Sequence, residues 1–169
     1  MEKLFKPKIW IKNVFVINEG FLNRHGIKGL ILDLDNTLSM HGSPAAEEGV
    51  EEWLSDMRRL GIKMSVVSNN TAKRVTPLAN KLGLDFIPFG CKPLTFGISK
   101  AVKHLGLPKK NLAVVGDQIF TDVIGGNLSG IMTILVEPFY LESGRVFKMK
   151  RRLEGAFFKR DYSRLNKDV

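Results

Sequence analysis

Apolar and polar positions alternate along this chain in a way that predicts strands followed by helices. From Gly29 onward, short runs rich in Val, Ile and Leu are each followed by a longer amphipathic segment. The short runs are apolar at consecutive positions, which is typical of strands buried on both faces of a parallel sheet. We predict the following order: strand 29–34, helix 46–60, strand 63–68, helix 72–82, strand 84–88, helix 94–105, strand 112–116, helix 121–129 and strand 132–136.

This β/α alternation predicts an α/β fold in which helices cover both faces of a central parallel sheet. We expect one domain, with residues 29–144 as its core. Residues 1–28 form a predicted N-terminal extension, in which the apolar run Val14–Ile17 suggests a short strand. Residues 145–169 form a predicted basic amphipathic segment, with an apolar stripe that includes Met149 and Phe157.

Polar side chains follow the predicted strands, at the edge of a parallel sheet where ligands collect. Those of interest are, in chain order, Asp33, Asp35, Ser68, Asn69, Lys92, Asp117 and Asp122. Carboxylates crowded at one edge repel each other, and a divalent cation would relieve the repulsion. Carboxylate oxygens without a His or Cys cluster suit Mg²⁺ better than Zn²⁺. We therefore predict a Mg²⁺ site, and such a site also attracts phosphate.

A phosphate bound at this edge gives the pair Asp33 and Asp35 a chemical interpretation. Asp33 can attack phosphorus to form an aspartyl phosphate, and Asp35 can protonate the leaving oxygen and then deprotonate water. Lys92, Ser68 and the amide groups near Asn69 can hold the other phosphate oxygens. The alternative is structural, because aspartates also serve as turn and helix-cap residues, Ser-Asn is common in turns, and a lysine can simply be solvated.

Four segments resemble the four motifs of the haloacid dehalogenase (HAD) superfamily of phosphatases, in the same order and over about residues 28–137. They are Asp-Leu-Asp-Asn-Thr-Leu from Asp33, Ser68-Asn69, Lys92-Pro93, and Gly-Asp-Gln-Ile-Phe-Thr-Asp from Gly116. The stretch from Gly26 to Leu38 and the overall length are similar to the YqeG branch (subfamily IIIA), which includes phosphatidylglycerophosphate phosphatases of mitochondria and plastids.

The resemblance implies a HAD-like Rossmannoid three-layer sandwich and a role for each motif residue. It makes Asp33 the nucleophile and Asp35 the acid/base, with Ser68 and Lys92 as phosphate ligands. It also implies that Asp33, the Asp35 carbonyl and Asp117 hold Mg²⁺, supported by Asp122.

Little chain is available for a cap domain over this site. About ten residues, 39–48, separate the first motif from the next predicted helix, and 70–92 holds one helix and one strand. An uncovered site favours a large or surface-presented substrate, such as a lipid headgroup, a protein or a nucleic-acid end. A partner subunit could still act as a lid, so a homo-oligomer stays open.

The net charge of +9 comes from the two ends of the chain. Residues 1–28 hold six basic and two acidic residues, and residues 145–169 hold nine and three. The C-terminal segment is therefore either an interfacial helix for an anionic membrane or a helix packed on the core with a solvated basic face. No apolar run approaches the about 20 residues of a membrane span, and Cys91 is the single cysteine. We expect a cytoplasmic protein, with peripheral membrane contact as an option.

Three functions fit these observations. The leading one is a Mg²⁺-dependent phosphomonoesterase, with phosphatidylglycerophosphate favoured by the resemblance. The second is a phosphatase for nucleotides or for RNA- or protein-bound phosphate, with the basic ends binding the polyanion. The third is a non-enzymatic, Mg²⁺-dependent phospho-acceptor like a signalling receiver domain, although such a domain accepts phosphate on a mid-chain aspartate where this chain has Ser68-Asn69-Asn70.

Overall fold

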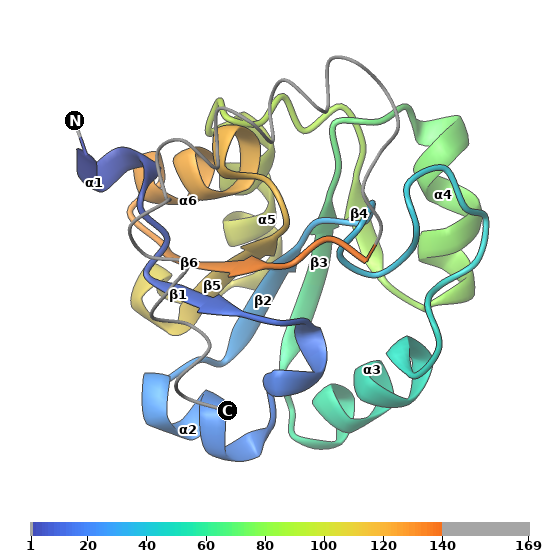
Figure 1. Ribbon diagram of the computed structural model, residues 1–169, viewed down its shortest axis with the longest axis horizontal. Coiled ribbons are helices and arrows are strands. Elements are labelled where there is room, and N and C mark those ends of the chain that lie inside the picture. The colour runs from blue at the N-terminus through green and yellow to red at the C-terminus, as the bar shows by residue number, and fades with distance from the viewer. Residues whose placement is uncertain (1, 140–169) are drawn as a thin grey trace. The chain divides into compact units, whose positions relative to one another are not determined.

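A parallel sheet of six strands organises residues 2–139, the part of the chain that the structure, a computed structural model, describes. The strands are Ile9–Ile11 (β1), Gly29–Leu32 (β2), Lys63–Val67 (β3), Asp85–Ile87 (β4), Leu112–Gly116 (β5) and Met132–Val136 (β6). Their order across the sheet is β1-β6-β5-β2-β3-β4, so β2 and β5 lie side by side in its centre (Figure 1). The predicted α/β fold with a central parallel sheet is confirmed.

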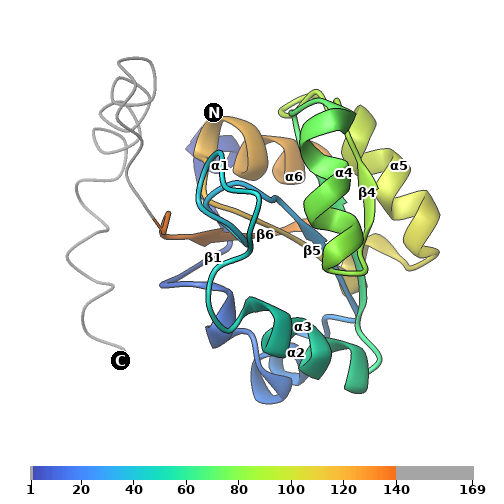
Figure 2. The same ribbon diagram turned by 90° about the vertical axis from the view of Figure 1, so that its right-hand side faces the viewer.

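Helices cover both faces of this sheet, which gives the predicted three layers. They are Glu2–Phe5 (α1), Glu19–His25 (α2), Val50–Arg59 (α3), Ala72–Lys81 (α4), Phe96–Leu105 (α5) and Ile124–Leu128 (α6), with short turns of helix at Val14–Val16 (η1), Lys109–Asn111 (η2) and Ile119–Val123 (η3). Helices α2 and α3 lie on one side of the sheet, and α5 and α6 lie on the other (Figures 1 and 2). None of the helices within residues 2–139 is long and apolar enough to span a membrane.

The central strand β2 shows why its sequence is apolar at consecutive positions. Leu30 and Leu32 pack into a core shared with Trp53 and Leu54 of α3, whereas Ile31 packs into a second core with α5. Successive side chains of a strand point to opposite faces of the sheet. Both faces of β2 are therefore buried, and the prediction of doubly covered strands is confirmed.

The predicted strand at Val14–Ile17 is wrong. Val14–Val16 form the 3₁₀ turn η1, and Val14 and the following Ile17 are both fully buried. A 3₁₀ helix has three residues per turn, so apolar positions three apart fall on one side. Val and Ile also favour strands, which is why the run predicts a strand from its sequence alone. The strand of this region is β1, which pairs in parallel with β6.

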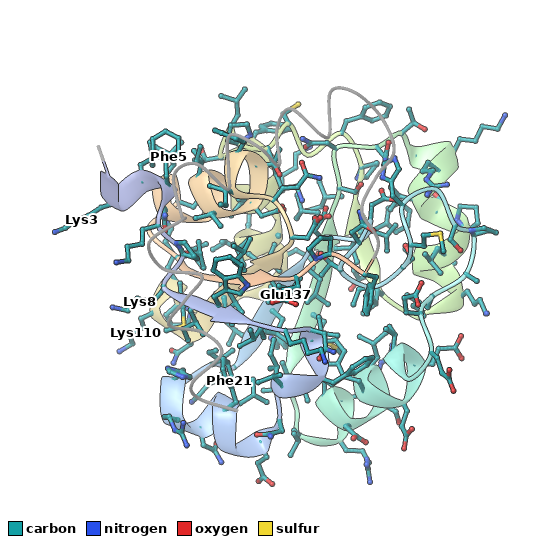
Figure 3. The ribbon with its side chains drawn as sticks, in the orientation of Figure 1. Lys3, Phe5, Lys8, Phe21, Lys110 and Glu137 are labelled. Atoms are coloured by element: carbon teal, nitrogen blue, oxygen red, sulfur yellow. The ribbon has the colours of Figure 1, made fainter. Side chains whose placement is uncertain are left out.

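Helix α1 also attaches the N-terminal residues to the rest of the fold, through contacts with α6 and η3. The side-chain amide of Asn127 donates to the carbonyl of Leu4 at 2.8 Å, and the rings of Phe5 and Phe120 meet edge to face at 6.3 Å between centroids. Figure 3 shows Lys3 and Lys8 projecting outward from this end of the chain. The N-terminal residues thus contribute a strand, apolar contacts and exposed charge.

The predicted helix 121–129 begins earlier and in a different form. Residues Ile119–Val123 make the π-helical turn η3, which runs into the short helix α6. A Cβ at Gly126 would lie 2.4 Å from Cγ2 of Thr133, so glycine lets α6 approach the sheet closely. Residues 39–49 contain no helix or strand of their own, and no cap domain is inserted in the described chain. The predicted segment 145–169, and residues 140–144 of the predicted core, lie outside the described residues.

Candidate active site

The candidate site lies at the carboxyl edge of the sheet, which is the edge where the parallel strands end. Strand β2 pairs with β5 so that Leu32 lies opposite Val115, and the Asp33 amide donates to the Val115 carbonyl at 2.8 Å. Asp33 and Asp117 therefore follow neighbouring strands that end at the same level. Parallel pairing in register brings together two residues that are far apart in the sequence.

Three buried carboxylates meet at this edge. Asp33, Asp117 and Asp122 each have an oxygen within 4.8 Å of the others, and all three side chains are buried. Asp122 is carried back toward the strand end by η3, and one of its carboxylate oxygens accepts from the Gln118 amide at 3.1 Å.

Gly116 makes room for this arrangement. A Cβ on Gly116 would lie 2.3 Å from Cγ of Asp122, which is far closer than two such carbons can approach. Any side chain at this position would displace the Asp122 carboxylate. The sequence places Gly116 in a motif, but the space that it leaves free becomes visible only in the structure.

Lys92 lies between two of the three carboxylates. Its ammonium is 2.6 Å from Oδ1 of Asp33 and 2.6 Å from Oδ1 of Asp122, and its side chain is only 3% exposed. Burial opposes protonation of this amine, but the charges of Asp122 and Asp33 raise the pKa of Lys92 above its ordinary value. Lys92 is therefore a charged donor held inside the site.

Burial has the opposite effect on Asp33. It raises the pKa of Asp33 to about 7, with Lys92 lowering it and the charges of Asp122 and Asp35 raising it further. The cluster thus contains three buried carboxyl groups and one ammonium, which contacts two of them. A donor set of carboxylates alone fits a hard divalent cation such as Mg²⁺, and Asp33, Asp117 and Asp122 are the residues that would hold it.

The backbone of Lys92 is fixed by Asn69. Oδ1 of Asn69 accepts from the Lys92 amide at 2.7 Å, and its amide nitrogen donates to the Lys92 carbonyl at 2.8 Å. Ser68 is buried next to it, and its hydroxyl oxygen accepts from the Asn70 amide at 3.1 Å. The predicted Asn69 side chain is thus engaged with Lys92, and phosphate binding by Ser68 and Asn69 stays a prediction.

The Asp35 carboxylate has a different set of partners. Asn70 donates to Oδ2 at 2.6 Å, and Arg74 donates to Oδ1 at 2.9 Å. The Gly42 amide also donates to Oδ1 at 3.2 Å, and Nδ1 of His41 lies 3.6 Å from the same oxygen. Several donors therefore fix the orientation of this carboxylate.

Sequence reasoning missed Arg74. Its guanidinium contacts Asp35 and also donates to the Gly42 carbonyl at 2.7 Å, which ties the loop after the first motif to α4. The available signal was position: Arg74 lies in the first turn of the helix that follows Ser68 and Asn69. A cation there faces the carboxyl edge of the sheet.

Comparisons with known proteins find one family model and several relatives. A model of the family described as "haloacid dehalogenase-like hydrolase" matches residues 45–130. The protein named probable phosphatase YqeG of Bacillus subtilis is 39% identical over 154 residues, which cover 91% of this chain and 90% of that protein. A phosphatidylglycerophosphate phosphatase 1 of Arabidopsis thaliana is 29% identical over 164 residues, covering 91% of this chain and 47% of that protein.

Solved structures share the fold. The crystal structure of a 4-nitrophenylphosphatase from Thermotoga maritima superposes with a TM-score of 0.59 at 14% sequence identity, covering 70% of this chain and 89% of that one. At this identity the likeness concerns the arrangement of strands and helices.

Proposed function

Since the chain belongs to the haloacid dehalogenase-like hydrolases, in the family of the probable phosphatase YqeG, and is a phosphatase, we propose that it hydrolyses phosphomonoesters with Mg²⁺ through an aspartyl phosphate on Asp33. The observation that carries this proposal is the meeting of three buried carboxylates with Lys92 at the carboxyl edge of the sheet. The alternative of turn and cap residues accounts poorly for three acids buried around one lysine.

Asp33 acts as the nucleophile in this proposal. One of its carboxylate oxygens forms a bond to phosphorus while the bond between phosphorus and the alcohol oxygen breaks. Lys92 and Ser68 hold phosphate oxygens and favour the charge that develops on them. Mg²⁺, held by Asp33, Asp117 and Asp122, supplies further charge compensation when it is bound.

Asp35 moves the protons. It gives a proton to the leaving alcohol oxygen, and it then takes one from the water that attacks the phosphorus of the aspartyl phosphate and releases Asp33. Hydrogen bonds from Asn70 and Arg74 hold the Asp35 carboxylate in one orientation. Arg74 is thus a positioning residue for the acid/base.

We assign phosphatidylglycerophosphate as the substrate that fits best. The relative from Arabidopsis carries that substrate in its name, and the absence of a cap domain from the described chain leaves the site open to a phosphate presented at a surface. A phosphomonoester at the end of a lipid headgroup can reach such a site while its acyl chains stay in the membrane.

Phosphate release in the presence of Mg²⁺ tests both levels of the proposal. The purified full chain is given phosphatidylglycerophosphate, a nucleotide, a sugar phosphate and a phosphopeptide, beside the Asp33→Asn variant as control. We expect release that depends on Mg²⁺ and on Asp33, with the lipid as the best substrate. Release that Asp33→Asn retains would overturn the mechanism, and a preference for nucleotide or phosphopeptide would overturn the substrate.

A further inference from the structure

We propose that the loop carrying Lys92 also inserts into the surface of an anionic membrane and thereby docks the enzyme on its substrate. This inference rests on the proposed lipid phosphatase function and deepens it. The segment concerned is residues 89–96, which we call the Lys92 loop. Its apolar side chains, backbone and surrounding charges each support the inference.

The Lys92 loop exposes three large apolar side chains. Phe89 is 56% exposed, Leu94 66% and Phe96 56%, and all three lie within eight residues around the buried Lys92. Leu94 is the most exposed large apolar residue within the described chain. A group of apolar side chains beside a catalytic group is typical of a surface that meets a partner.

The backbone holds these side chains outward. The Gly97 amide donates to the Gly90 carbonyl at 3.1 Å, which closes the loop at its base, and the Leu94 amide donates to the Cys91 carbonyl at 2.8 Å. Two glycines allow this close packing, because a Cβ on Gly97 would lie 2.5 Å from the Gly90 carbonyl oxygen. The loop is therefore compact and closed by its own backbone hydrogen bonds.

Phe89 adds a separate indication. Its φ angle of 50° lies in the left-handed region, which is unfavourable for a bulky residue and occurs mainly where structure or function requires it. Core packing does not account for this conformation, since the ring is mostly exposed. The Phe89 amide donates to the Asn70 carbonyl at 3.0 Å and the Gly90 amide to the Ser68 carbonyl at 2.8 Å, so the backbone is held in this conformation while the ring stays exposed.

The charge around the loop fits an anionic lipid surface. The exposed Lys73 lies in the first turn of α4 beside the loop, since the Phe89 amide donates to the carbonyl of Asn70 just before this helix at 3.0 Å. The ammonium of Lys100 lies 4.3 Å from the centroid of the Phe96 ring. Apolar tips with cations behind them can enter the headgroup region while the cations contact lipid phosphates.

Insertion of this loop would also bring the active site to the depth of the lipid phosphates. Lys92 sits in the same loop as the inserting residues, so docking the loop at headgroup depth brings the buried ammonium to the level of lipid phosphates. No cap domain stands between the loop and the site in the described chain. The membrane itself would then cover the site during the reaction.

Vesicle sedimentation tests the inference with the full chain. The vesicles contain either equal parts of phosphatidylglycerol and phosphatidylcholine or phosphatidylcholine alone. The test variant replaces Phe89, Leu94 and Phe96 by serine. The control variant replaces exposed apolar residues elsewhere by serine, namely Val16, Leu60 and Leu128.

We expect the loop variant to partition onto anionic vesicles at least about tenfold less than the wild type, since burying even one such side chain contributes about that factor. The control variant should sediment like the wild type. The loop variant should still hydrolyse a short-chain, water-soluble phosphomonoester at the wild-type rate. Equal sedimentation of the loop and control variants, or no sedimentation of the wild type, would overturn the inference.

A second measurement removes any dependence on how the triple variant folds. Phe89→Trp should show fluorescence quenching by brominated lipid in anionic vesicles, and Leu60→Trp should not; equal quenching of the two would overturn the inference. Both are also made with Asp33→Asn, so vesicle contact is measured without turnover. Failure of the proposed function would instead appear as missing phosphate release on every substrate, whatever the vesicle result.

Discussion

Replacing Lys92 by methionine should strongly destabilise the Mg²⁺-free protein. The ammonium lies 2.6 Å from both Asp33 and Asp122, and Asp117 is within the same cluster. Methionine keeps most of the side-chain volume but removes the ammonium that contacts the buried carboxylates of Asp33 and Asp122. Removing one partner of a buried ion pair costs about 3–5 kcal/mol. For a chain of this length, that corresponds to a fall in melting temperature of about 6–20 °C.

The size of this loss should depend on pH and on Mg²⁺. Burial raises the pKa of Asp33 to about 7 even with Lys92 present, so at lower pH the carboxyls of the variant can take up protons, which weakens their repulsion. The loss should therefore be largest above pH 7. Mg²⁺ should restore part of it, by about 2.7 kcal/mol at 100 times its dissociation constant.

Thermal unfolding followed by circular dichroism, with EDTA and with Mg²⁺, measures both effects. Lys103→Met is the matched control, because Lys103 is exposed on α5 and its replacement should change stability by less than about 0.5 kcal/mol. If Lys92→Met and the control had the same melting temperature in EDTA, the reasoning would be refuted. A loss of stability that Mg²⁺ leaves unchanged would refute the idea that the carboxylates hold a cation.

Three further predictions concern the same edge of the sheet. Gly116→Ala should raise the Mg²⁺ concentration for half-maximal activity by about 10–100-fold, because the new Cβ displaces Asp122. A Mg²⁺ titration of activity measures this, and a curve that matches the wild type would contradict it. Arg74→Ala should lower kcat by about tenfold or more with little change in KM, since Arg74 orients Asp35; steady-state kinetics measure it, and Arg74→Lys should recover part of the loss. In Mg²⁺-free buffer, the free energy of unfolding of the wild type should fall as pH rises from about 3.8 to about 7, because the folded state keeps on Asp33 a proton that the unfolded chain releases. Urea titrations at several pH values check the slope, and saturating Mg²⁺ should abolish it.

The sequence was sufficient for the parts of this fold that repeat a simple pattern. Strand β2 is apolar at consecutive positions because both of its faces are buried, and the sequence shows this pattern directly. Residues that follow parallel strands must gather at one edge, so Asp33 and Asp117 could be placed near each other in advance. Strand β1 was missed because three residues are too few to show a period, and its neighbours are lysines that also suit a surface.

Other features depend on contacts between distant residues, which no local pattern contains. Arg74 meets Asp35 across 39 positions, and nothing in its own segment distinguishes it from the exposed Lys73. The space that Gly116 leaves for Asp122 likewise depends on how η3 turns back after β5. Such features become visible only in the tertiary structure, because each depends on the relative positions of two segments of the chain.

Two hydrogen bonds with Asn69 fix the backbone of Lys92. The position of the lysine and the character of the exposed loop surface therefore depend on different residues of one short segment. Asn69, just after β3, fixes the position of the reactive lysine, while the side chains of Leu94 and Phe96 are mostly exposed. These side chains can therefore be exchanged to suit a different surface or substrate without retuning the chemistry. That makes this tip a natural place to engineer substrate range, with the anchoring asparagine left untouched.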